Sequence, residues 1–277
     1  MSVNLLTSYA NQLDNKLTVE SFTKAHAKGE VRFIDVKAGI IEVLTPTTVT
    51  PSDYKISDKN DRYGGITEMG DSKATYQVSN DKSFKLGLDE GNKKGQANLK
   101  QAGEMLKLQI REQITPMMDK VYFAKLVATA IATSQKIIHV AKKSVEEVAT
   151  ATEYLDEALA PASDRILFVS SEYRKDIRNE ITTTMNAPQT NDKLVSKGII
   201  GELDGFTVVK VPKSYFPANV LAIAVWTGAV SNAAIINEAR VKTDSEMLSG
   251  DLLIGRYKFD TFVQEAKKNT IAVIATA

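Results

Sequence analysis

The feature that most constrains this chain is the stretch Gln96–Thr133, in which apolar residues recur at alternating spacings of three and four. These positions are Leu99, Ala102, Leu106, Ile110, Ile114, Met117, Val121, Ala124, Ala128 and Ile131. That spacing is the period of one face of an α-helix. A single helix of about 38 residues would be roughly 57 Å long at 1.5 Å per residue. Because a compact domain needs no helix of that length, we expect either an elongated subunit or a partner that covers part of the helix.

Pro116 lies inside this periodic stretch. A proline has no backbone N–H, and its ring collides with the carbonyl of the preceding helical turn. We therefore expect the helix to be kinked or interrupted near Thr115.

The composition is that of an ordinary folded protein and excludes several classes of site. Of the 277 residues, 43% are hydrophobic and 25% are charged, which is enough for a sizeable core. Its 35 basic and 34 acidic residues give a net charge of +1, so no broad attraction to nucleic acid or membrane follows. The chain has no cysteine, which excludes disulfides, thiolate metal sites and a cysteine nucleophile. No stretch resembles a signal peptide or a membrane helix, so we expect a cytoplasmic site of synthesis.

Three kinds of sequence precede the long helix. Residues 3–28 carry a narrow apolar stripe, which fits either an ordinary first helix or an arm that packs on a neighbouring subunit. Residues 30–50 are rich in β-forming residues. Residues 51–95 are polar and rich in turn residues, with short strands expected at 74–78 and 83–88. This last segment has too few apolar residues for a core of its own, so we expect a long, two-stranded, protruding loop with a functional role.

Helix and strand patterns alternate after the long helix. We expect a short strand at 137–140, a helix at 144–159 opened by a capping box of Ser144 and Glu147, and a buried strand at 165–169. A helix capped at 170–172 and strands at 206–211 and 220–225 complete a compact unit over 143–243. At the end, strands at 252–263 and 270–274 are expected to form a hairpin along the long helix.

No sequence motif for catalysis or ligand binding is convincing. The chain lacks a phosphate-binding glycine loop, a GxSxG elbow and an HExxH motif, and Gly198–Gly201 is better explained as a turn before a strand. His26 and His139 have no second ligand one helical turn away. Asp58 and Asp61 lack the ligand spacing and closing glutamate of a calcium loop. We therefore predict no catalytic, cofactor-binding or metal-binding residues. We interpret Trp226 as a core residue and expect Glu146 and Glu147 to be solvated. A structural role is favoured over an enzyme.

Three segments occur in a distinctive order: PMMDKVYF at 116–123, LDEALAPASDRILFVSSEY at 155–173 and IGELDGFTVV at 200–209. Together they resemble the major capsid proteins of tailed bacteriophages with the HK97-type fold, and the resemblance extends over nearly the whole chain. It implies an α+β fold with a long spine helix, a β-rich peripheral domain, an extended β-hairpin loop and a compact α/β axial domain.

The resemblance also implies a division of the chain. Residues 1–30 would form an N-terminal arm, and residues 31–95 a strand followed by the extended loop at about 45–95. Residues 96–142 would form the peripheral domain with the spine helix, residues 143–243 the axial domain, and residues 244–277 a return to the peripheral domain as a long β hairpin. Some relatives crosslink a lysine of the extended loop to a neighbour. Of the lysines here (Lys55, Lys59, Lys73, Lys82 and Lys85), no feature marks one, so no crosslinking residue is assigned.

The implied function is self-assembly into hexamers and pentamers that form an icosahedral shell around double-stranded DNA. The implied partners are other copies of the chain and packaged DNA without sequence-specific contacts, together with separate scaffolding, portal and decoration proteins. No membrane or cofactor is implied. The implied location of the protein is the virion, and assembly would take place in the cytoplasm of the bacterial host. Two alternatives remain open on the sequence: an encapsulin-type nanocompartment shell with the same fold, and an α/β enzyme or ligand-binding protein using residues 143–243.

Overall fold

The computed structural model describes residues 21–29, 33–37, 40–57, 60, 62–64, 66, 68–91, 102–184, 199–243 and 248–276. The chain divides into two compact units, one of residues 1–30 and 79–277 and one of residues 31–78. The apolar stripe expected at residues 3–28 is described only from Ser21 onward, and the first turns of the expected long helix, residues 96–101, also lie outside the described ranges. None of the described helices is both long and apolar enough to cross a membrane.

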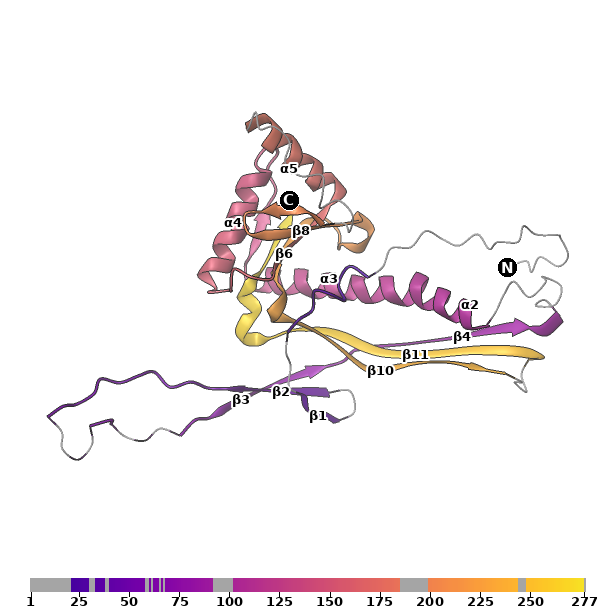
Figure 1. Cartoon of the computed structure of the whole chain (residues 1–277), viewed down its shortest axis with the longest axis horizontal. Coiled ribbons are helices and arrows are strands. Elements are labelled where there is room, and N and C mark those ends of the chain that lie inside the picture. Colours follow the sequence, from indigo (N-terminus) through magenta and orange to yellow (C-terminus); the bar gives the residue numbers. More distant parts are fainter. Residues whose placement is uncertain are drawn as a thin grey trace. The chain divides into compact units, whose positions relative to one another are not determined.

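The smaller unit is a three-stranded antiparallel sheet in the order β1-β2-β3. It consists of β1 (Phe33–Lys37), β2 (Ile40–Pro46) and β3 (Asp71–Gln77), which confirms the strand character predicted for residues 30–50. β2 and β3 pair from Ile40 opposite Gln77 to Pro46 opposite Asp71. They therefore form one hairpin, and residues 47–70 connect its two strands (Figure 1).

The long helix is interrupted where the proline predicts it. It consists of α2 (Ala102–Gln109), a π-helical turn η1 (Ile110–Ile114) and α3 (Thr115–Ala132). The Thr115 N–H donates to the Ile110 carbonyl, five residues back. Pro116 follows directly and has no N–H to donate. The interruption near Thr115 is thus confirmed, and its form is a π turn rather than a simple kink.

A second three-stranded antiparallel sheet, in the order β10-β11-β4, lies along this helix (Figure 1). It contains β4 (Asn80–Asp89), β10 (Val230–Lys242) and β11 (Gly250–Val263). Ile114 packs on Tyr257 and Phe259 of β11, as the predicted apolar stripe requires. Beyond the π turn the prediction is wrong: the stripe positions Ala124, Ala128 and Ile131 are exposed. The face of α3 that is buried instead carries Tyr122, Phe123, Leu126, Val127 and Ala130. Because β4 pairs with β11, the range of about 45–95 proposed for the extended loop includes a strand of a different sheet.

The hairpin expected from residues 252–263 and 270–274 does not form. β11 pairs instead with β10 and β4, whereas β12 (Ile271–Ala275) pairs with β9 and β5 in another sheet. The 3-10 helix η5 (Glu265–Thr270) connects the two. All five residues of β12 are buried, and such a strand needs cover on both faces. A hairpin lying on one helix would leave one of those faces in water.

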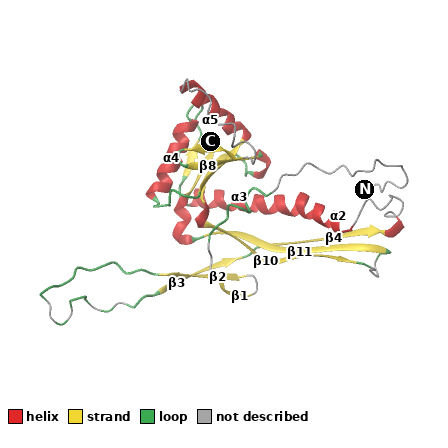
Figure 2. Ribbon diagram, viewed as in Figure 1, coloured by secondary structure: helices red, strands yellow, loops and turns green. Residues whose placement is uncertain are grey.

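That other sheet has six strands in the order β5-β12-β9-β6-β8-β7. Its remaining strands are β5 (Lys136–Ile138), β6 (Arg165–Ser170), β7 (Ile199–Leu203), β8 (Phe206–Val211) and β9 (Val220–Trp226). Helices α4 (Ser144–Glu157) and α5 (Ser171–Thr184) pack on one face and α3 packs on the other (Figure 2). The predicted strands at 137–140, 165–169, 206–211 and 220–225 are confirmed, except that β5 ends at Ile138. The short 3-10 helices η3 (Lys213–Tyr215) and η4 (Thr227–Ala229) flank β9.

The two predicted helix caps have different outcomes. The Ser170 hydroxyl accepts a hydrogen bond from the Tyr173 N–H at 3.2 Å, which confirms the cap of α5. The capping box of Ser144 and Glu147 is wrong, because the Ser144 hydroxyl has no hydrogen-bond partner among the described residues. The Glu147 carboxylate is buried and directed toward other groups, so its predicted solvation is also wrong.

Candidate assembly interfaces

The described residues of the loop 47–70, which belongs to the smaller unit, make contacts from one side of the loop to the other. At its base the Thr47 N–H donates to the Gly70 carbonyl at 2.9 Å. Farther out, the Lys55 N–H donates to the Arg62 carbonyl at 3.0 Å. The rings of Tyr54 and Tyr63 meet edge to face with centroids 5.1 Å apart. These contacts show that the two sides of the loop pair with each other beyond the β2–β3 ladder.

Large apolar side chains of this loop are exposed to solvent. The exposed fractions are 51% for Val49, 49% for Tyr54, 79% for Ile56, 84% for Tyr63, 102% for Ile66 and 66% for Met69. Single exposed apolar residues are ordinary on protein surfaces, but a concentration of them marks an interaction site. The loop therefore has the chemistry of a segment that buries its side chains against another surface.

A buried carboxylate in α3 holds the beginning of the described chain. Asp119 is 1% exposed. It accepts hydrogen bonds from the Ser21 hydroxyl at 2.7 Å, the Thr23 hydroxyl at 2.6 Å and the Phe22 N–H at 3.1 Å. A buried carboxylate is tolerated only with such donors. Asp119 therefore fixes the turn at residues 21–24 on the long helix.

Residues 26–29 continue this attachment to the larger unit. The His26 ring packs edge-on against Phe168. Burial lowers the pKa of His26, and the nearby Lys28 charge lowers it further. Gly29 donates its N–H to the Val230 carbonyl at 2.8 Å, and a Cβ at this position would lie 2.7 Å from that carbonyl oxygen. The close approach explains why glycine stands at position 29.

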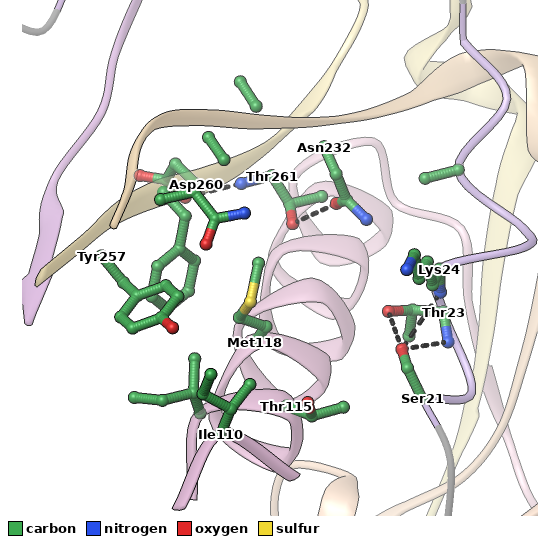
Figure 3. Close-up of a pocket in the computed structure, with 16 residues that line it drawn as sticks. Ser21, Thr23, Lys24, Ile110, Thr115, Met118, Asn232, Tyr257, Asp260 and Thr261 are labelled. Carbon is green, nitrogen blue, oxygen red and sulfur yellow. Dashed lines mark hydrogen bonds between the residues drawn. The ribbon is translucent and has the colours of Figure 1, made fainter. Parts of the chain in front are cut away.

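A cavity of about 430 Å³ lies beside the π turn. Figure 3 shows Ile110 and Met118 of the helix facing it, with Tyr257 of β11 on the other side. At the polar edge, Thr261 donates its hydroxyl to the Asn232 side-chain oxygen at 2.8 Å, and the Asp260 carboxylate accepts from the Thr261 N–H. The hydrogen bonds of these three residues are made within the protein, so the cavity is mainly an apolar space beside the helix interruption.

His139, Glu147 and Tyr173 form a polar network between β5, α4 and α5. The Glu147 carboxylate accepts from the Tyr173 hydroxyl at 2.8 Å and from the Val140 N–H at 2.6 Å, and it lies 2.9 Å from His139 Nδ1. Burial raises the pKa of Tyr173, and the Glu147 charge raises it further. The network joins the three elements, and none of its residues lines either of the two cavities that border the long helix.

The segment 155–173, on which part of the capsid resemblance rests, is held together by Arg165. This side chain is 6% exposed. Its guanidinium donates to the carbonyls of Ala160 at 2.6 Å and Pro161 at 2.9 Å, and it pairs with Asp156 at 2.7 Å. The proline and arginine of this segment therefore fix the passage from the end of α4 into β6, which is a structural role.

The other residues considered from sequence are scattered. Gly201 lies in β7 at a φ of 132°, whereas Asp58 and Asp61 lie outside the described residues. Trp226 is partly buried against both cores of the larger unit, as expected for a packing residue. Among the described residues, no group of three or more acidic or histidine side chains is placed to hold a metal ion.

The loop lysines are divided between the two units. Lys55 and Lys73 belong to the β2–β3 hairpin and its loop, and Lys73 pairs with Glu42 of β2 at 2.5 Å. Lys82 and Lys85 lie on β4 of the larger unit, and Lys59 lies outside the described residues. The structure therefore separates side chains that the sequence places in one segment.

Sequence reasoning missed the roles of Asp119 and Glu147. Both occur among polar neighbours in helices, and their burial depends on elements far away along the chain. No local signal marked Asp119, because a residue two positions from Met117 and Val121 lies on the opposite helix face from that pair.

No protein-family model matches the chain, and no curated protein matches it in sequence. Solved structures match it over nearly its whole length. The capsid structure of the cyanophage P-SCSP1u is 11% identical with a TM-score of 0.73, covering 98% of this chain and 93% of that one. A chain from Mycobacterium phage Che8 is 15% identical with a TM-score of 0.69, covering 99% and 96%. The mature capsid of bacteriophage PhiM1 is 10% identical with a TM-score of 0.64, covering 98% and 92%.

At such low identities the likeness establishes the fold. The predicted fold class, mixed helix and sheet built around a long helix, is confirmed. The chain has the fold of the chains that form phage capsid structures.

Proposed function

We propose that this chain is the major capsid protein of a tailed bacteriophage, a structural subunit rather than an enzyme. The observation that carries the proposal is the match of 98% of the chain to two phage capsid structures. A match of this extent includes both compact units, so the likeness is not confined to one common substructure. The encapsulin alternative shares the fold but is not favoured, because the matched structures are those of phages.

Within this proposal the parts of the chain take the roles implied by the resemblance. Residues 1–30 are the arm, attached to its own subunit through residues 21–29. Residues 47–70 are the part of the extended loop that docks on a neighbouring subunit. The long helix with the β10-β11-β4 sheet forms the peripheral domain, and the six-stranded sheet with α4 and α5 forms the axial domain.

The exposed loop supports self-assembly. A loop on one copy that docks on a different surface of the next copy makes a heterologous contact, and such contacts close into rings. We propose hexamers and pentamers joined in an icosahedral shell around double-stranded DNA. The shell is a virion component, assembled in the host cytoplasm, with separate scaffolding, portal and decoration proteins as further partners.

The test is expression of the full chain, alone and with its candidate scaffolding protein, followed by electron microscopy. We expect rings or closed shells. A chain that stays monomeric under all assembly conditions, with an ordered loop, would contradict the proposal. Shells isolated from the native host separate the two shell functions, since a capsid contains DNA and a nanocompartment contains an enzyme.

Substitution in the loop tests which surface drives assembly. Ile66→Asp removes apolar area from a fully exposed side chain, so the folded subunit should keep its melting temperature. Shell yield should fall at least tenfold. Ile66→Leu is the matched control and should assemble as the wild type does, because it retains the apolar area. Normal shells from Ile66→Asp would exclude this side chain from the interface.

A further inference from the structure

We infer that a basic groove along the long helix binds the phosphate backbone of double-stranded DNA. The basic groove lies between residues 21–25 and residues 107–115, and Lys24, Lys107 and Arg111 line it. The inference rests on the proposed capsid function, because double-stranded DNA is the polyanion that such a shell would enclose. It adds which surface of the subunit contacts that DNA.

The charge of the groove has a single sign. Lys24, Lys107 and Arg111 are exposed, and no acidic side chain is among the residues that line the groove. None of the three forms an ion pair with any residue that the structure describes. Like charges four residues apart on a helix, as at Lys107 and Arg111, repel each other and slightly destabilise the helix. The electrostatic energy of the groove is therefore more favourable with an anionic ligand bound than in the free subunit.

Two features of the fold hold the cations in place. Lys24 donates its N–H to the Ser21 hydroxyl at 3.2 Å, and that hydroxyl donates to the buried Asp119 carboxylate. Figure 3 shows Ser21, Thr23 and Lys24 together on this turn. On the opposite side, Arg111 lies within the π turn, and such turns recur at functional sites. The groove is thus bounded by a clamped segment and by the helix interruption.

The spacing of the cations fits a nucleic acid strand. Lys107 and Arg111 are one helical turn apart, about 6 Å along the axis. Phosphates of one DNA strand repeat at about 3.4 Å along the duplex, so the two side chains reach approximately every second phosphate. The groove is wide, with a volume of about 780 Å³. Contacts of this kind position the backbone and carry no sequence information, as a shell protein requires.

A local concentration of charge also reconciles DNA binding with the overall balance of the chain. The net charge is only +1, which gives no general attraction to DNA. Three cations that line one groove with no acidic side chain among its lining residues create attraction at that place, while the rest of the chain carries a net charge of −2, from +1 minus +3.

The test measures binding of the full, unassembled chain to a labelled 24-base-pair duplex by fluorescence anisotropy at salt concentrations from 50 to 200 mM. Three phosphate contacts predict that wild-type affinity falls about 40-fold over this range, a slope of about −2.7 in a double-logarithmic plot. The triple variant Lys24→Gln, Lys107→Gln, Arg111→Gln should lose most of this slope and bind at least tenfold more weakly at 50 mM salt.

The control variant carries the same loss of three charges on exposed lysines outside the groove: Lys125→Gln, Lys136→Gln, Lys210→Gln. It should bind DNA as the wild type does. Equal weakening by both variants, or no weakening by the groove variant, would overturn the inference, as would tighter binding of polyglutamate than of DNA in the same groove. Electron microscopy of each variant separates the two proposals. Wild-type shells without groove-dependent DNA binding contradict only this inference, whereas absence of shells from the wild-type chain contradicts the proposed function.

Discussion

At the scale of single residues, two buried carboxylates determine how distant segments join the larger unit. Asp119 receives three hydrogen bonds from residues 21–23, and Glu147 receives the Tyr173 hydroxyl and the Val140 N–H. Each carboxylate accepts hydrogen bonds from segments that are not adjacent to it in sequence. Removing one carboxylate would leave those donors buried without an acceptor. The unfolding free energy would then fall by more than the net contribution of the hydrogen bonds, because the desolvated donors remain unpaired.

We predict that Asp119→Ala lowers the unfolding free energy by about 3 kcal/mol, because two hydroxyls and one N–H lose their acceptor. Urea denaturation measures the change. Glu172→Ala is the matched control: it removes a carboxylate from an exposed pair with Lys213, and its stability should stay close to that of the wild type. Equal stability of both variants would show that water replaces Asp119.

His26 should make stability depend on pH. Burial, reinforced by Lys28, lowers the pKa of His26 from its ordinary value of 6.5. The unfolded chain therefore binds a proton more readily, and this contribution to stability is lost as the pH falls below 6.5. We expect His26→Phe, which keeps a ring against Phe168, to lose less stability than the wild type between about pH 7.5 and pH 5.5. Identical pH dependence in urea denaturation would contradict this assignment.

At the scale of elements, the interruption of the long helix combines a local and a tertiary cause. Pro116 removes a donor from the helix, while Ile114 and its apolar neighbours pack on Tyr257 and Phe259. Converting the π turn to an α turn would rotate α2 by about 100° relative to α3. Ile110 would then leave its apolar surroundings.

We therefore predict that Pro116→Ala keeps the π turn, although it restores the missing N–H. A crystal structure of the variant decides the question. A continuous α-helix through residues 110–114 would show that the proline, and not the packing, causes the interruption.

At the scale of the whole molecule, the division into two units makes the loop separable. β2 and β3 pair with each other, and β4 belongs to the larger unit. A deletion of residues 54–92 would therefore remove a strand of the helix-backed sheet along with the loop, whereas a deletion inside the β2–β3 connection leaves both sheets complete.

We predict that replacing residues 47–70 by Asn-Gly, which suits a two-residue hairpin, leaves both units folded and abolishes stable shells. Circular dichroism and thermal melting check the fold, and electron microscopy checks assembly. Shells of normal stability from this variant would show that the loop does not supply the assembly contact.

The sequence by itself determined the features that depend on local periodicity and local chemistry. The helix, its interruption at Pro116, the strands β6, β8 and β9 and the cap at Ser170 all follow from spacing or from neighbours within a few residues. The resemblance of three short segments within residues 116–209, together with the order of the predicted elements, was enough to predict the fold class. Tertiary structure alone decided that β12 joins the six-stranded sheet, that β4 pairs with β11 and that Glu147 is buried. It also decided that Lys24 lines one groove together with Lys107 and Arg111. These outcomes depend on contacts between residues far apart in sequence, and neither partner's own sequence records which strand it will pair with or which distant donors will surround a carboxylate.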